Sequence, residues 1–190
     1  MKFHRIAVAS GCIIITSLLF GCMAGMVDTA QSIPSTLVAK DYNNLVSRYQ
    51  DRPTFVSIEV MRDGSRVLSV TMNAFDTSGH TIMFYEQDSS KYIAAIDKFL
   101  DWEAKALDRG DMVEKEIAVI PTPPGFNISF GFKSANPKLH YLNLGFSHSG
   151  LLGEMIAPVM TLDHDGAESL RKLLIDLPKM SARVQGDDYK

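Results

Sequence analysis

The chain has 190 residues, of which 19 are basic and 22 acidic, giving a formal charge of −3. This length suits one domain, which at such a size buries roughly two thirds of its unfolded surface and so can be stable without metal or disulfide. No basic run follows Arg5, and nucleic-acid binding relies on clustered Lys and Arg, so we expect no nucleic-acid partner.

The first 22 residues have the layout of an export signal. Lys2 and Arg5 precede an apolar run from Ile6 to Phe20, and small residues follow. The segment ends in Leu19-Phe20-Gly21-Cys22, and no cysteine follows Cys22. This ending resembles the lipobox of bacterial lipoproteins, in which a small residue precedes an invariant lipidated cysteine. The resemblance implies that Cys22 carries a diacylglyceryl group, becomes the mature N-terminus and is then acylated, typically with palmitate.

A lipidated Cys22 also explains why an exported chain would keep one lone thiol. Without Lys2 and Arg5, 17 basic residues remain against the same 22 acidic ones, a formal −5. Met23 stands where an Asp favours inner-membrane retention in Gram-negative lipoproteins. The resemblance therefore implies an envelope protein sorted to the cell outer membrane and facing the periplasm.

Three other interpretations of this segment stay open. The first is an uncleaved membrane anchor, which is less favoured because the apolar run is shorter than the roughly 20 residues that a membrane-spanning helix needs. Cleavage after Ala24 would release a free periplasmic protein. A buried helix of the fold is disfavoured because the run lacks a polar face.

Four segments follow from these boundaries. Residues 1–21 are the expected signal peptide, 22–35 the lipidated N-terminus and tether, 36–180 a single globular domain, and 181–190 a polar tail. Within the domain, Leu37, Val38, Tyr42, Leu45, Val46 and Tyr49 fall near one helical face. That spacing predicts a helix over 36–50, which Pro53 would close.

Alternating apolar and polar residues then predict two blocks of strands. The predicted strands are 55–62, 66–75, 81–86, 113–120, 126–133, 139–147 and 154–162. A helix over 91–109, ended by Gly110, separates the blocks, and a last helix follows Asp163 or Asp165. The spacing of Glu168 after Asp165 is that of a capping box.

This order, α-βββ-α-ββββ-α, predicts an α+β fold of antiparallel sheets with helices on one side. Each strand block ends in a helix, an order that resembles the two-unit arrangement of Whirly-like single-strand binders. The resemblance is one of order alone and implies no function. The strand over 126–133 should bury Phe126, Ile128, Phe130 and Phe132 together against Leu142, Leu144 and the last helix.

Candidate chemical motifs are few. Gly145-Phe146-Ser147-His148-Ser149-Gly150 resembles the nucleophile elbow G-x-S-x-G, but a strand rather than a helix is expected to follow it. His140 and His148 would lie about 26 Å apart on one straight strand, too far to share a metal. Asp163-His164-Asp165-Gly166 matches part of a calcium loop and better fits a helix cap. Arg109-Gly110-Asp111 is an adhesion tripeptide and also a plain helix end.

We therefore predict no catalytic, cofactor-binding or metal residues, and Cys22 as the lipidation site. The expected function is that of a membrane-anchored envelope lipoprotein, a non-enzymatic module that binds a protein partner or supports an assembly. The alternative is a lipid-anchored hydrolase or small-ligand binder whose site is assembled from distant residues. A deep pocket that joins His140 or His148 to Ser147 and an acid would favour the alternative, and a grooved surface would favour the first.

Overall fold

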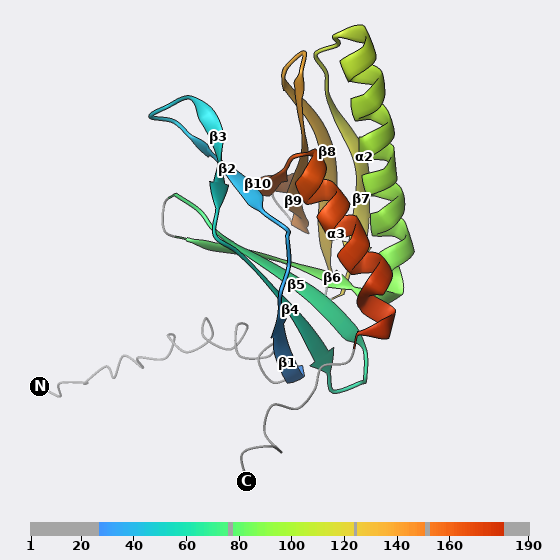
Figure 1. The fold of residues 1–190 in the computed structure, drawn as a ribbon. Helices are drawn as coiled ribbons and strands as arrows, with labels where there is room; N and C mark the ends of the chain where they lie inside the picture. The colour runs from blue at the N-terminus through green and yellow to red at the C-terminus, as the bar shows by residue number, and fades with distance from the viewer. Residues whose placement is uncertain (1–26, 76–77, 124, 151–152, 181–190) are drawn as a thin grey trace, which may run out of the picture.

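The computed structural model describes residues 27–180 except 76–77, 124 and 151–152, and for residues 147–159 it describes the backbone alone. The described chain is α+β, as predicted, with two antiparallel sheets and two helices (Figure 1). The four-stranded sheet has the order β1 (Val27–Ile33), β4 (Thr54–Met61), β5 (Arg66–Asn73), β6 (Gly79–Tyr85). The six-stranded sheet has the order β3 (Arg48–Arg52), β2 (Ala39–Asn43), β10 (Gly153–Leu162), β9 (Leu139–Gly150), β8 (Phe126–Asn136), β7 (Glu114–Thr122).

The helices α2 (Ser89–Arg109) and α3 (His164–Asp176) each follow a run of hairpin-linked strands. A short 3-10 turn, η1 (Glu86–Asp88), leads into α2, and another, η2 (Leu177–Lys179), follows α3. Gly110 ends α2 in the left-handed conformation, with φ of 68°, as its position after the last apolar residue predicts. No helix in the described ranges combines the length and the apolar character needed to cross a membrane.

The helix predicted over 36–50 is wrong, because these residues form the β2–β3 hairpin. Tyr42 pairs with Tyr49 across it, and the Asn43 side chain accepts the Leu45 N–H at 2.9 Å, which closes the turn. Apolar spacing misled here because Leu45 and Val46 are not core residues. Leu45 is 95% exposed at the hairpin tip, and so the apparent helical stripe mixes tip and strand side chains.

The expected tether over 22–35 includes strand β1. This strand pairs antiparallel with β4, from Val27 opposite Met61 to Ile33 opposite Val56. The sequence VDTAQSI carries weak strand propensity, and β1 forms because an ordered partner edge satisfies its backbone groups. Regular structure is therefore already present at Val27, nearer to Cys22 than expected.

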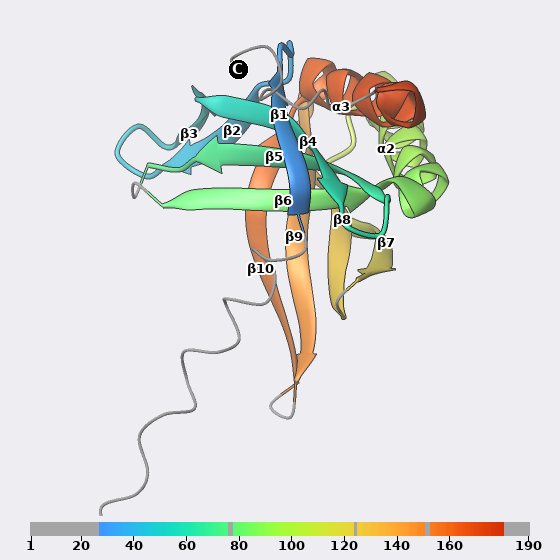
Figure 2. The same ribbon diagram turned by 90° about the horizontal axis from the view of Figure 1, so that it is seen from below.

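One core joins both sheets and both helices, and both helices pack on the same face of the six-stranded sheet (Figure 2). Tyr92 of α2 links the layers, because its ring contacts Phe84 of β6 at 5.3 Å and Phe130 of β8 at 6.1 Å between centroids. Ile128, Phe130 and Phe132 are buried as predicted. Phe126 is 41% exposed, contrary to the prediction, because it lies at the first position of β8, beyond the cover of α2.

Candidate functional site

The six-stranded sheet has a second face, turned away from the helices. Because side chains alternate along a strand, β8 places Ser129, Gly131 and Lys133 on this face. Its neighbour β9 places Gly145, Asn143 and Tyr141 directly opposite those three residues. Two of these six residues, Gly131 and Gly145, are glycines, so no side chain covers the backbone of the sheet there.

A groove of about 350 Å³ runs over this bare strip. The lining residues that belong to this face of the sheet are Glu114, Glu116, Ser129, Gly131, Lys133, Asn143 and Gly145. A Cβ at Gly131 would meet nothing closer than the Asn143 side chain, at 3.8 Å, so the space above it is open. The groove is thus shallow and wide rather than a deep pocket.

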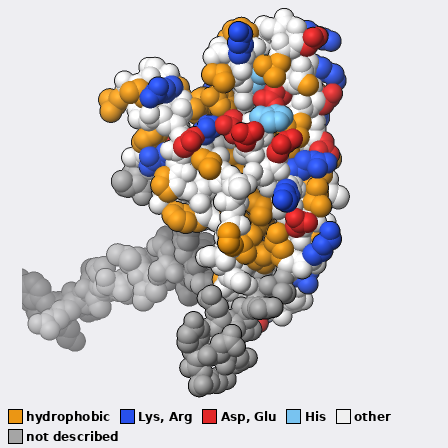
Figure 3. All heavy atoms as spheres, in the orientation of Figure 1, with side chains coloured by type: hydrophobic (Ala, Val, Ile, Leu, Met, Phe, Trp, Pro, Cys, Tyr) orange, Lys and Arg blue, Asp and Glu red, His pale blue; other side chains and the backbone are white. Residues whose placement is uncertain are grey.

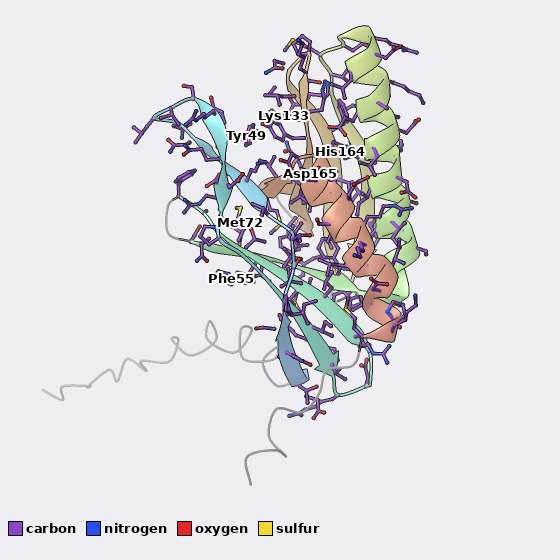
Figure 4. The ribbon with its side chains drawn as sticks, in the orientation of Figure 1. Tyr49, Phe55, Met72, Lys133, His164 and Asp165 are labelled. Atoms are coloured by element: carbon purple, nitrogen blue, oxygen red, sulfur yellow. The ribbon has the colours of Figure 1, made fainter. Side chains whose placement is uncertain are left out.

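A second cavity of about 160 Å³ continues the groove toward the β2–β3 hairpin and shares Lys133 and Asn143 with it. Tyr49 of β3 lines the same cavity. In a flat sheet, β3 and β8 would lie about 19 Å apart, four strand spacings of about 4.8 Å. The sheet therefore curls so that the hairpin faces β8, and Figure 4 shows Tyr49 and Lys133 on either side of that space.

Tyrosines lie on the hairpin side of the second cavity. Tyr42 and Tyr49 meet edge to face at 5.2 Å, and Tyr49 contacts Tyr141 of β9 at 4.4 Å. Tyr42 is 43% exposed. Burial is the main cause that raises the pKa of Tyr141, so its hydroxyl stays protonated at neutral pH and is available as a donor. Such side chains combine an apolar ring with a polar tip, which is typical of protein-binding surfaces.

Two lysines beside the groove are held in ion pairs. Lys40 forms ion pairs with Asp51 and with Asp163, the latter at 3.0 Å, and Lys133 lies 3.9 Å from Glu114. Burial opposes the charge on Lys40, yet the hydrogen bonds to Asp51 and Asp163 outweigh it and raise the lysine pKa. Lys40 is therefore a fixed cation that ties the hairpin to α3, not a base poised for proton transfer.

The residues singled out from the sequence do not assemble into a catalytic site among those described. His140 is 3% exposed on the helix-covered face, where its ring stacks on Phe132 at 5.4 Å. The side chains of Ser147, His148 and Ser149 lie outside the described set, as does Cys22. Residues 145–150 lie inside β9, which pairs with β10, so the near-match to the nucleophile elbow lacks its strand-to-helix turn.

Asp163 caps α3, since its carboxylate accepts the Gly166 N–H at 3.0 Å. The cap places Asp165 inside the first turn, so the Asp165–Glu168 capping box is wrong. Within the described residues there is no group of three side chains suited to holding a metal ion. The segment instead joins the helices, because the His164 Nδ1 lies 2.6 Å from the buried Glu103 carboxylate of α2.

The surface around the start of α3 and the hairpin carries acidic and basic side chains in mixture (Figure 3). At the far end of α2, Arg109 is the last helical residue and Gly110 is the left-handed cap. The tripeptide 109–111 is thus a helix end in this fold, and the Asp111 N–H closes it on the Ala106 carbonyl at 3.0 Å.

Sequence reasoning missed the groove itself. The signal was present in Gly131, a glycine inside a strand that otherwise alternates apolar and polar residues, which often marks a close approach of another backbone. The sequence predicts a helix at the hairpin tyrosines, and it therefore gives no sign that they lie beside the groove. No protein-family model matches the chain, and a search of curated proteins finds no match.

Proposed function

We propose that the protein is a membrane-anchored envelope lipoprotein that binds a segment of a protein partner in the groove and has no catalytic role. The observation that carries this proposal is the bare strip at Gly131 and Gly145, because a strip without side chains admits an extended chain against the sheet. The tyrosines beside it offer rigid contact area at little entropic cost. The partner belongs to the same envelope compartment.

The anchor in this proposal is the lipid on Cys22, with the outer membrane as its expected place in a Gram-negative cell. Mass spectrometry of the protein isolated from envelopes should give a chain that starts at Cys22 and carries acyl mass. A chain that starts at Gly25 without added mass would refute the anchor. Fractionation to the inner membrane alone would refute the sorting.

Groove binding is tested by filling the groove. Gly131→Ile adds a side chain suited to a strand, and Gly131 has no positive φ that would strain it. A photo-crosslinking residue in place of Tyr49 should capture one defined partner in living cells, and Gly131→Ile should abolish that product. Thr81→Ile is the matched control, since it adds the same side chain at an exposed position of β6. Crosslinking that survives Gly131→Ile would show that the groove is not the binding surface.

The hydrolase alternative keeps one observation in its favour. The Ser78 Oγ lies 2.9 Å from the His80 Nε2, and His80 lines the 160 Å³ cavity. A hydroxyl within reach of an imidazole is the start of a nucleophilic site. However, Asp41, the acid in the same cavity, does not complete such a site. Its carboxylate accepts the backbone N–H groups of Tyr42 and Phe75 instead, at 2.8 and 2.9 Å. Labelling of Ser78 by a fluorophosphonate, lost in Ser78→Ala and His80→Ala, would favour the hydrolase over the binding module.

A further inference from the structure

Strand β1 is held firmly at the point where the described chain begins. It pairs with β4 along its length, and Val27 packs against a small apolar cluster on the outer face of the four-stranded sheet. Met61, Val67 and Tyr85 form the buried part of that cluster. Val27 is therefore a fixed point of the fold and cannot act as part of a loose tether.

Only residues 23–26 separate Val27 from Cys22. Five residue steps of a fully extended chain span at most about 18 Å, so a lipid on Cys22 would hold the start of β1 close to the bilayer surface. We propose that the end of the molecule formed by the start of β1 and the β4–β5 turn, residues 62–65, rests against the lipid headgroups. This inference rests on the lipid anchor of the proposed function.

The chemistry of the β4–β5 turn suits a phosphate-rich surface. Arg62 is exposed and forms no ion pair with any residue that the structure describes. Its neighbours are already engaged, because Ser65 donates to Asp63 at 2.6 Å and Arg66 pairs with Glu86 at 3.3 Å. An unpaired guanidinium next to the anchor point can bind lipid phosphate oxygens.

The proposed binding surface then points away from the bilayer. The hairpin of β2 and β3 and the C-terminal end of α2 lie at the opposite end of the molecule from the start of β1 (Figure 1). Figure 2, seen from below, agrees, since β1 lies in front and the hairpin behind. A short anchor at one end and a groove toward the other would present the groove to partners within the periplasm.

The orientation can be measured by depth-dependent quenching in vesicles. Because no cysteine follows Cys22 and a lipidated Cys22 has no free thiol, one introduced cysteine takes a fluorescent label selectively. The mature lipidated protein carries Asp63→Cys or, at the hairpin tip, Asn44→Cys. It is reconstituted in vesicles of phosphatidylethanolamine and phosphatidylglycerol that contain a spin-labelled headgroup lipid. We expect the label at 63 to lose most of its fluorescence and the label at 44 to keep it.

Charge reversal of Arg62 tests the chemistry separately. Arg62→Glu should reduce the quenching at 63, whereas Arg109→Glu, an equal change at the exposed far end of α2, should leave it unchanged. Equal quenching at 63 and 44, or stronger quenching at 44, would overturn the orientation while the anchor stands. Failure of the protein to float with the vesicles would refute the anchor and, with it, this inference.

Discussion

At the scale of single residues, the contact between His164 and Glu103 joins α2 and α3 through a buried carboxylate. Glu103 is 6% exposed, and a carboxylate so buried needs a partner to offset its lost hydration. His164 supplies that partner across the interface of α2 and α3, and Glu168 adds a second acid at 3.7 Å. The pair thus couples the packing of the two helices to a group that titrates near neutral pH.

We expect the stability of the protein to depend on the protonation of His164. The hydrogen bond to Glu103 is the largest cause that raises the His164 pKa above its ordinary value of 6.5, burial opposes it, and the charges of Glu103, Glu168 and Asp165 add to it. A raised pKa means that the fold favours the charged ring. Its contribution is fully present below pH 6.5 and is lost as the pH rises through the folded-state value.

Urea titrations at pH values from below 6.5 to above the folded-state pKa of His164 should therefore give a lower free energy of unfolding at the alkaline end. His164→Gln should remove that part of the pH dependence, and Glu103→Gln should lower the His164 pKa measured by NMR. A His164 pKa at or below the ordinary value in the wild type would contradict the pairing.

A second prediction concerns Phe130, which is fully buried and contacts Tyr92 of α2. Phe130→Ala removes a large ring from the core and should lower the free energy of unfolding by about 3–5 kcal/mol. Phe126→Ala is the matched control on the same strand, and should cost much less because Phe126 is 41% exposed. Equal losses for the two variants in urea unfolding would show that the core is not centred on β8.

At the scale of elements, the β2–β3 hairpin decides the shape of the candidate site. It joins the six-stranded sheet through a single register pair, Thr161 opposite Lys40. The ion pairs of Lys40 with Asp51 and Asp163 hold its base. Arg52, also at the base, donates to the carbonyls of Asn73 and Ala74, at 2.8 and 2.9 Å, which links the hairpin to the four-stranded sheet. The hairpin is thus held at its base while its tip projects.

The turn of this hairpin contains Ser47 at φ of 51°, a left-handed conformation that costs a non-glycine residue about 1 kcal/mol. Ser47→Gly relieves that strain but adds freedom to the unfolded chain, so a small net change of less than about 1 kcal/mol is expected. Ser47→Val should lower the melting temperature, because a β-branched side chain fits this conformation poorly. A melting temperature unchanged in Ser47→Val would contradict the turn geometry.

At the scale of the whole molecule, one core includes both sheets and both helices, so the two sheets should unfold together. Strand β1 closes the free edge of β4 and covers Met61 and Val67 through Val27. A chain that starts at Ser35 would leave that edge unpaired and Val67 exposed.

We therefore expect a chain that starts at Ser35 to melt well below a chain that starts at Met23, and to aggregate more readily. Differential scanning calorimetry and light scattering would measure both effects. For the longer chain, the melting temperature should not change with a chelator or a reductant. Equal melting of the two chains would mean that β1 contributes nothing to the fold.

The sequence by itself determined the strands with regular alternation, the helix ended by Gly110, and the burial of Ile128, Phe130 and Phe132. These features depend on local spacing, which the chain carries in any context. It also marked Cys22 as the lipidation site to be tested. The tertiary structure alone decided that 39–52 is a hairpin and 27–33 a strand. Such segments take their conformation from the partner edge that satisfies their backbone groups. The cavity that continues the groove toward the hairpin likewise exists only because curling of the sheet brings Tyr49 to face Lys133, residues 84 positions apart in sequence.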